Sequence, residues 1–202
     1  MKTIMKSWKQ FVNENEGSNQ IFLNGKEIEN LKPIAGGASS WILSGQDGKI
    51  YAMSSVGYGD TSKPWLSAYY LQASPKPKHL PAIEYLGVAE MGGDEYYLTR
   101  MPFYRSTPSA KCEGIEETIN KFRLDPFGED RYFDSIPESC RDEIMELLSE
   151  MDSFEDFMLD KGDDGIYRDW NMANIGWDGE DNLVFFDGYT TEIPFGEDKN
   201  DL

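Results

Sequence analysis

The chain has 202 residues, of which 39% are hydrophobic and 13% aromatic. This composition suits one globular domain or two lobes sharing a cleft, and it excludes an intrinsically disordered protein. The net charge of −18 argues against direct binding to nucleic acid or to anionic membrane surfaces, because both depend on clustered Lys and Arg.

One histidine and two cysteines are too few for a zinc site with four Cys or His ligands, and they argue against a Cys/His nucleophile pair. We expect Cys112 and Cys140 to be free thiols in a reducing compartment. The first residues lack an apolar segment of secretory length, and no stretch is long enough to span a membrane. These features predict a cytoplasmic protein.

The first predicted element is an amphipathic helix over residues 2–14, which we expect to pack onto the domain rather than onto a membrane or a partner. A β-rich region follows. Residues 39–55 predict a hairpin around a Gly-Gln-Asp-Gly turn, and residues 82–90 and 94–101 predict two more strands. Between them, a short helix is expected to start at Pro64, followed by a proline-rich loop.

The pattern changes near residue 102. Residues 105–137 give no clear element, whereas residues 138–160 carry an apolar stripe at helical spacing and predict a long helix that ends before Gly162. The expected organisation is an N-terminal helix over residues 1–20, a β-rich part over 21–101 and a helical part over 102–202.

Three polar residues follow the long helix at a spacing that suits a metal site. Asp169 is predicted in a loop, Asn174 follows five residues later, and Asp187 ends a short apolar strand after a turn. Mg²⁺ prefers oxygen ligands, and a nearby carboxylate can accept a proton from an attacking hydroxyl. The alternative is that these residues only cap turns. A calcium loop starting at Asp178 is excluded, because its sixth position is Leu183 instead of glycine.

This segment resembles the catalytic and metal-binding loops of the protein-kinase-like superfamily, which includes the aminoglycoside-phosphotransferase type. The chain reads Tyr-Arg-Asp, four residues, Asn, and then Asp-Gly. The resemblance implies that Asp169 is the catalytic base or substrate-orienting carboxylate, with Arg168 beside it in the catalytic motif. Asn174 and Asp187 become the Mg²⁺ ligands.

The resemblance also implies an α+β, protein-kinase-like bilobal fold, with a β-rich N-lobe and a truncated helical C-lobe. Because only fifteen residues follow Asp187, the chain resembles the reduced kinase-like proteins of some bacteriophages more than it resembles a eukaryotic kinase. A glycine-rich turn would cover the phosphates, one strand residue would pack on adenine, and the hinge at residues 99–102 would contact adenine through its backbone. The implied nucleotide-binding residues are Gly36, Gly37, Ser39, Ser40, Ala52 and Met101. An ordinary hairpin bend and an ordinary strand end are the alternatives.

The match breaks at Ser54, which stands where the family has a strand lysine, and the following predicted helix has no Glu to pair with such a lysine. Two explanations remain open. Another cation can replace the lysine, with Lys49 on the same strand or Lys63 in the next loop as candidates, or the domain is a pseudokinase.

The expected function is Mg²⁺- and ATP-dependent transfer of the γ-phosphoryl group to a hydroxyl, on a protein substrate. No direct nucleic-acid or membrane partner is expected, and the location would be the host cytoplasm if the chain is phage-encoded. The alternatives are a pseudokinase that binds a nucleotide or a protein, and an acidic nucleic-acid mimic that occupies a basic partner. Transfer of a nucleotidyl group also remains open.

Overall fold

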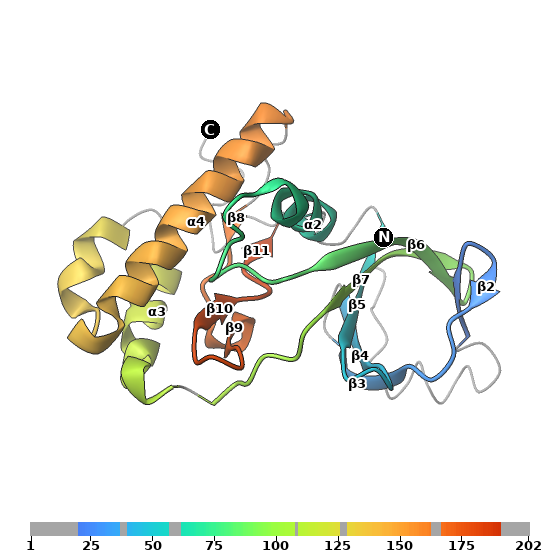
Figure 1. Ribbon diagram of the computed structural model, residues 1–202, viewed down its shortest axis with the longest axis horizontal. Coiled ribbons are helices and arrows are strands. Elements are labelled where there is room, and N and C mark those ends of the chain that lie inside the picture. Colours follow the sequence, from blue (N-terminus) through green and yellow to red (C-terminus); the bar gives the residue numbers. More distant parts are fainter. Residues whose placement is uncertain are drawn as a thin grey trace, which may run out of the picture. The chain divides into compact units, whose positions relative to one another are not determined.

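A large curled antiparallel sheet and a few helices give the protein an α+β architecture in the computed structural model (Figure 1). The structure describes residues 20–36, 40–56, 62–107, 109–125, 129–162 and 167–190. The helix predicted over residues 2–14 lies outside these ranges. Among the described residues, no helix combines the length and the apolar composition that a membrane span requires.

The chain divides into two units, one of residues 1–68 and 83–103 and the other of residues 69–82 and 104–202. The division after residue 103 lies close to the predicted boundary at residue 101. The segment 69–82 differs from the prediction, because it belongs with the mainly helical unit and not with the β-rich one.

The β-rich region predicted over residues 21–101 forms one seven-stranded sheet in the order β2-β1-β6-β7-β5-β4-β3. The predicted hairpin is present as β4 and β5, and the two predicted strands are β6 and β7, joined at Gly92 and Gly93. Both glycines have positive φ, which side chains with a Cβ adopt rarely. The strands are β1 (Ile21–Leu23), β2 (Lys26–Glu27), β3 (Lys32–Gly36), β4 (Ser40–Ser44), β5 (Ile50–Ser55), β6 (Glu84–Met91) and β7 (Asp94–Met101).

One face of this sheet carries the apolar core of the first unit. On β5, Tyr51 and Met53 belong to that core. Because side chains alternate along a strand, Ala52 and Ser54 point to the opposite face. The buried core residues are Ile21, Leu43, Tyr51, Met53, Ala89, Met91, Tyr96 and Leu98.

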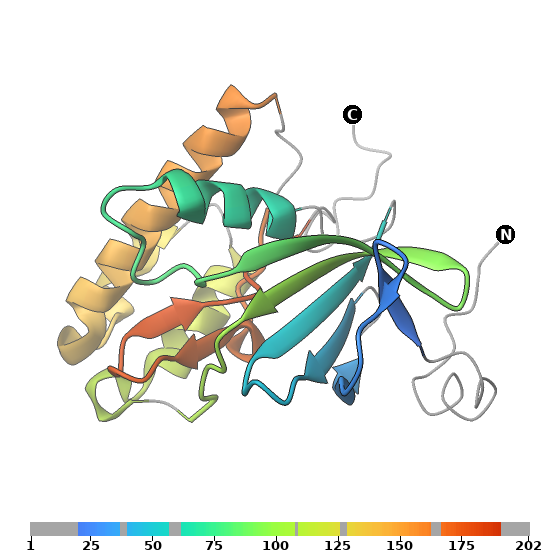
Figure 2. The same ribbon diagram turned by 45° about the vertical axis from the view of Figure 1, so that its right-hand side comes forward.

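Helix α2 (Ser62–Gln72) starts two residues before Pro64, where the sequence predicted its beginning. Proline is tolerated there because the first turn of a helix has no partner for its backbone N–H groups. The backbone N–H of Tyr85 donates to the Ser67 hydroxyl at 2.9 Å, which attaches α2 to the start of β6 (Figure 2). Lys63, predicted in a loop, therefore lies in the first turn of a helix.

The predicted long helix is confirmed as α4 (Arg141–Asp160), preceded by the 3₁₀ turn η3 (Glu138–Cys140). Gly162, with φ +78°, follows its end. Residues 110–135, which the sequence left without clear elements, form η1 (Ala110–Cys112), α3 (Ile115–Leu124) and η2 (Glu129–Ser135). All six residues of the predicted apolar stripe on α4 are buried: Ile144, Leu147, Leu148, Met151, Phe154 and Met158.

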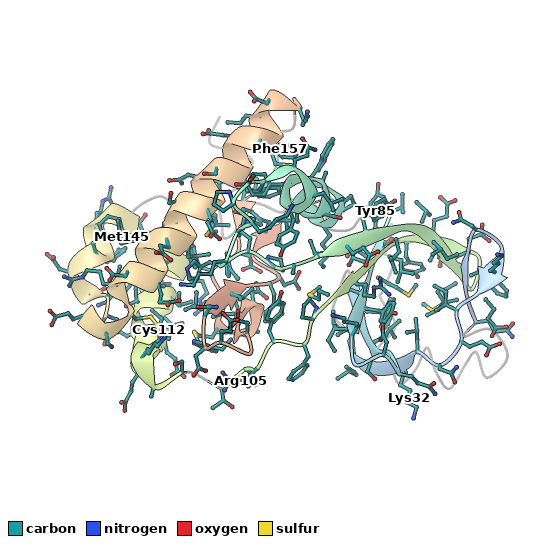
Figure 3. All side chains as sticks on the ribbon, in the orientation of Figure 1. Lys32, Tyr85, Arg105, Cys112, Met145 and Phe157 are labelled. Atoms are coloured by element: carbon teal, nitrogen blue, oxygen red, sulfur yellow. A yellow bond between two sulfur atoms is a disulfide. The ribbon has the colours of Figure 1, made fainter. Side chains whose placement is uncertain are left out.

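The expectation of two free thiols is wrong, because Cys112 and Cys140 form a disulfide. Cys112, labelled in Figure 3, ends η1, and Cys140 ends η3. Both are buried, and their Cα atoms are 4.8 Å apart. The sequence separation of 28 residues gave no local signal for the pairing. The cytoplasmic location therefore stays a prediction without the support that free thiols would have given it.

We expect reduction of this disulfide to destabilise the second unit, because the bridge restricts the unfolded chain across a loop that contains α3. For a loop of this length, the chain-entropy estimate is a loss of about 3.6 kcal/mol. The measurement is thermal unfolding with and without dithiothreitol, and a Cys112→Ser/Cys140→Ser variant serves as the control that should ignore the reductant. Two titratable thiols in the unreduced native protein would contradict the bridge.

Candidate functional site

The predicted site lies on a chain segment that two backbone interactions close into a loop. Strand β8 (Tyr167–Arg168) pairs antiparallel with β11 (Tyr189–Thr190). Next to this pairing, the backbone N–H of Asp169 donates to the carbonyl oxygen of Gly188 at 2.7 Å. Two residues nineteen positions apart are thereby neighbours, and Asp169 lies beside the Asp-Gly end of the segment.

Asn174 contacts Asp169 directly, as the predicted site requires. Its side-chain amide donates to the Asp169 backbone oxygen at 3.0 Å and to the Asp169 carboxylate Oδ2 at 2.9 Å. The short 3₁₀ turn η4 (Met172–Asn174) delivers Asn174, and the Asn171 side chain caps this turn by accepting from the Ala173 N–H. Because the amide nitrogen binds Asp169, the carbonyl oxygen Oδ1 is the atom of this side chain that can coordinate a cation.

Asp187 follows the hairpin of β9 (Ile175–Trp177) and β10 (Leu183–Phe185). The N–H of Phe186 donates to the carbonyl oxygen of Asn174 at 2.9 Å, and the carbonyl of Gly188 accepts from Asp169. Asp187 therefore sits between two residues that are hydrogen-bonded to the other two members of the site.

Asp169, Asn174 and Asp187 are all half-buried, and backbone hydrogen bonds position the segments that carry them. The arrangement offers one amide oxygen and two carboxylates, which are the donors that hard cations such as Mg²⁺ prefer. Within the described ranges, no group of three or more His, Cys, Asp and Glu side chains gathers closely enough to hold a metal ion. The expected metal-binding pair is not covered by this statement, because it has two members and one of them is an asparagine.

Arg168 is directed to α4 and away from the predicted chemistry. Its guanidinium donates to Glu155 at 2.6 and 2.9 Å and to Asp152 at 2.5 Å. These carboxylates lie on one side of α4, three residues apart, where helical neighbours meet. Arg168 thus positions the loop that carries Asp169, and it does so from a largely buried side chain.

The turn between β9 and β10 is held by Asp178. Its carboxylate accepts from the backbone N–H groups of Glu180 and Asn182 and from the Asn182 side chain, at 2.8 to 2.9 Å. Partial burial by itself would raise the pKa of Asp178. The hydrogen bonds together lower the pKa by more than burial raises it, so the net shift is downward. Arg105 adds an ion pair to Asp181 in the same turn, and it can be followed by its label in Figure 3.

The sequence analysis missed His79, which is fully buried. Its ring nitrogens lie 2.7 Å from the carbonyl oxygen of Leu183 and 3.0 Å from the carboxylate of Glu146, and its own carbonyl oxygen accepts from the Phe185 N–H at 2.9 Å. The hydrogen bond from His79 has the largest effect on the pKa of Glu146 and lowers it, and the hydrogen bond from Lys78 lowers it as well.

Glu150 was also missed. Its carboxylate accepts from three successive backbone N–H groups, those of Lys78, His79 and Leu80, at 2.7 to 3.1 Å. The segment 78–80 is thereby fixed between α4 and β10, which leads to Asp187. A lone histidine in a proline-rich loop carried no sign of partners about seventy or more residues away.

Tyr104 supports the residue just before Asp187. Its ring stacks on Phe186 with centroids 5.9 Å apart, and its hydroxyl accepts from the Ala82 N–H at 3.0 Å. Burial raises the pKa of Tyr104 to about 12. Gly176 lies so close that a Cβ there would be 2.7 Å from the Tyr104 Cβ, so the hairpin can approach Tyr104 only with glycine at this position.

The predicted nucleotide-binding residues belong to the first unit. Gly36 ends β3 and Ser40 starts β4, so they flank the turn, whereas Gly37 and Ser39 lie outside the described residues. Ala52 on β5 is fully buried and pairs with Thr99 on β7, and Met101 ends β7 and is also buried. The register therefore places Ala52 and the predicted hinge on adjacent strands.

Ser54, at the position where the resemblance implies a lysine, is in contact with a lysine from elsewhere. The ammonium of Lys63 donates to the Ser54 hydroxyl at 3.3 Å, and both side chains are buried. Lys49, the other candidate cation, is exposed.

Comparison with known proteins gives no relative: no family model matches the chain, and no curated protein matches it. The case for any function therefore depends on the residues and their geometry.

We expect Gly188→Ala to distort the Asp187 loop, because a Cβ at Gly188 would overlap the Phe185 ring. That ring cannot move away easily, since it is fully buried and stacks on Trp170 with centroids 4.7 Å apart. Overpacking of this kind costs about 1 to 3 kcal/mol, measurable by urea unfolding. The matched control is Gly179→Ala, where a Cβ meets nothing within 4 Å. Equal stabilities of the two variants would contradict this packing.

Proposed function

We propose that this chain is a phosphotransferase of protein-kinase-like fold that binds Mg²⁺-ATP and transfers the γ-phosphoryl group to a hydroxyl, on a protein substrate. The observation that carries the proposal is the direct contact of Asn174 with Asp169, with Asp187 held between the residues that bind both. These residues also follow a long helix, and a short hairpin separates Asn174 from Asp187, in the order that the resemblance implies.

The donor set fits the cation that such a reaction uses. Asn174 Oδ1 and the Asp187 carboxylate are hard oxygen donors on a rigid hairpin, and they would hold Mg²⁺ together with nucleotide phosphates. When bound, Mg²⁺ neutralises the negative charge that gathers on the phosphates.

Asp169 would orient the acceptor hydroxyl and receive its proton. Its Oδ2 is fixed by Asn174, which holds the carboxylate in one orientation and leaves the group able to accept a second hydrogen bond. As the acceptor oxygen bonds to the γ-phosphorus, the bond from that phosphorus to the bridging oxygen breaks, ADP leaves, and the acceptor proton passes to the carboxylate. Position and charge supply most of the rate in such transfers, and covalent help from the protein is small.

The first unit would bind the nucleotide. Its antiparallel sheet, with the turn between β3 and β4, the buried Ala52 and the end of β7 at Met101, supplies the elements that the N-lobe of the family uses in the same chain order. This agreement supports a bilobal kinase-like fold as the finer description of the α+β architecture.

A pseudokinase is the second candidate, and Ser54 is the observation that favours it. Without a lysine at this position on β5, phosphate alignment could be lost while nucleotide or protein binding persists. An acidic nucleic-acid mimic is supported only by the net charge of −18.

The test combines nucleotide binding with turnover. We expect isothermal titration calorimetry to show ATP binding that requires Mg²⁺ and is lost in Asp187→Asn. The control is Asp156→Asn, which makes the same charge change at an exposed position on α4.

Release of ADP should fall by about 10²- to 10⁴-fold in Asp169→Asn, the range of general-base catalysis, while nucleotide binding persists. Binding without any ADP release would favour the pseudokinase. A wild-type chain that binds no Mg²⁺-ATP would overturn the phosphotransferase and the nucleotide-binding form of the pseudokinase.

A further inference from the structure

A buried lysine and a buried serine are hydrogen-bonded to each other on the face of β5 opposite the apolar core. The Lys63 side chain is 2% exposed and Ser54 is 0% exposed, and the lysine ammonium lies 3.3 Å from the serine hydroxyl. Buried lysines are rare, because the long side chain normally carries its ammonium to water. The first turn of α2 therefore holds this charge at a defined place in the first unit.

That place is the end of the sheet where the glycine-containing turn is attached. In the β4–β5 register, Ser54 is the partner of Ser40, the first residue of β4. Gly36, the last residue of β3, pairs with the next residue of β4, Trp41. The ammonium of Lys63 is thus next to the strand position from which the predicted phosphate-covering turn departs.

Ala52 lies on the same face of β5 as Ser54, because it is two residues away. Two residues of strand span about 7 Å. A nucleotide whose base packed on Ala52 and whose phosphates ran along β5 toward the turn would bring these phosphates to Lys63. Lys49 does not meet this requirement: it is exposed, precedes β5, and lies five residues, or about 17 Å, from Ser54.

Resting on the proposed function, we propose that Lys63 is the phosphate-binding cation of this protein, carried by α2 instead of by β5, and that Ser54 holds its ammonium in position. A phosphate-binding lysine on α2 would explain both departures from the family pattern, the serine at position 54 and the absence of a Glu in the helix. A lysine borne by the helix makes the strand lysine unnecessary, and it also removes the need for a helix Glu to fix that strand lysine.

An ammonium carries three donors, and the serine hydroxyl is one of its partners. Hydrogen bonds between an ammonium and phosphate oxygens are stronger than those to a neutral hydroxyl, because both groups are charged. Loss of the ammonium should therefore weaken the binding of the phosphates and not that of the base.

The experiment measures the affinities of Mg²⁺-ATP and of adenosine by calorimetry in three proteins: wild type, Lys63→Met and Lys49→Met. We expect Lys63→Met to weaken Mg²⁺-ATP about 10- to 100-fold, as loss of a charged hydrogen bond does, and to leave adenosine affinity unchanged. Lys49→Met should change neither affinity. Wild-type affinity for ATP in Lys63→Met, a loss in Lys49→Met instead, or a parallel loss of adenosine binding would each overturn the inference.

A second pair of variants covers the case in which Lys63→Met does not fold. Ser54→Ala keeps the ammonium but removes its hydrogen bond, and we expect it to weaken ATP and not adenosine. Ser54→Lys combined with Lys63→Met returns the charge to β5 and should restore ATP affinity. Unchanged ATP affinity in Ser54→Ala would contradict the role assigned to the pair.

The outcomes separate this inference from the proposed function. A wild-type chain that binds no Mg²⁺-ATP would overturn the function itself, and the inference with it. A wild-type chain that binds Mg²⁺-ATP, alongside a Lys63→Met variant that binds it equally well, would overturn only the role of Lys63.

Discussion

The site depends on the hydrogen bonds that join Asn174 to Asp169. One amide group binds both the backbone oxygen and the carboxylate of the same aspartate, so neither side chain can turn without breaking a bond. Two backbone bonds, from Asp169 to Gly188 and from Phe186 to Asn174, then bring the end of the β9–β10 hairpin to the same place. The rest of the second unit supports this arrangement: α4 anchors Arg168, and the buried segment around His79 supports β10.

Local patterns in the sequence predicted the parts of this structure that local forces determine. The apolar stripe of α4 repeats at helical spacing, and every member of it is buried. The spacing of Asp169, Asn174 and Asp187 predicted a common site, and hydrogen bonds join Asn174 to Asp169 and the neighbours of Asp187 to both, while the role of the three stays a prediction. What the sequence did not predict depends on distant partners: the Cys112–Cys140 bridge joins residues 28 positions apart, and the contacts of His79 reach across about seventy residues or more. No periodicity records such pairings, because they form only when the fold brings the segments together.

The sequence indicated part of what the structure shows for Lys63, but not all of it. We considered Lys63 as a replacement cation because position 54 carries serine and not lysine. The sequence, however, predicted Lys63 in a loop and did not favour it over Lys49. The hydrogen bond of Lys63 to Ser54 and the exposed position of Lys49 favour Lys63 in the proposed site. A protein with a net charge of −18 repels a nucleotide at long range, so cations fixed close to the phosphates carry particular weight in the proposed site. The inferred cation of the first unit is Lys63, whose buried ammonium is hydrogen-bonded to Ser54.

The central claim is that Asn174 and Asp187 bind the Mg²⁺ of a nucleotide. The most direct measurement is a crystal structure of the full chain with Mg²⁺ and a non-hydrolysable ATP analogue. The account predicts a cation coordinated by Asn174 Oδ1 and the Asp187 carboxylate and by phosphate oxygens of the analogue. A nucleotide bound away from these residues, or a cation that leaves Asn174 and Asp187 uncoordinated, would contradict it.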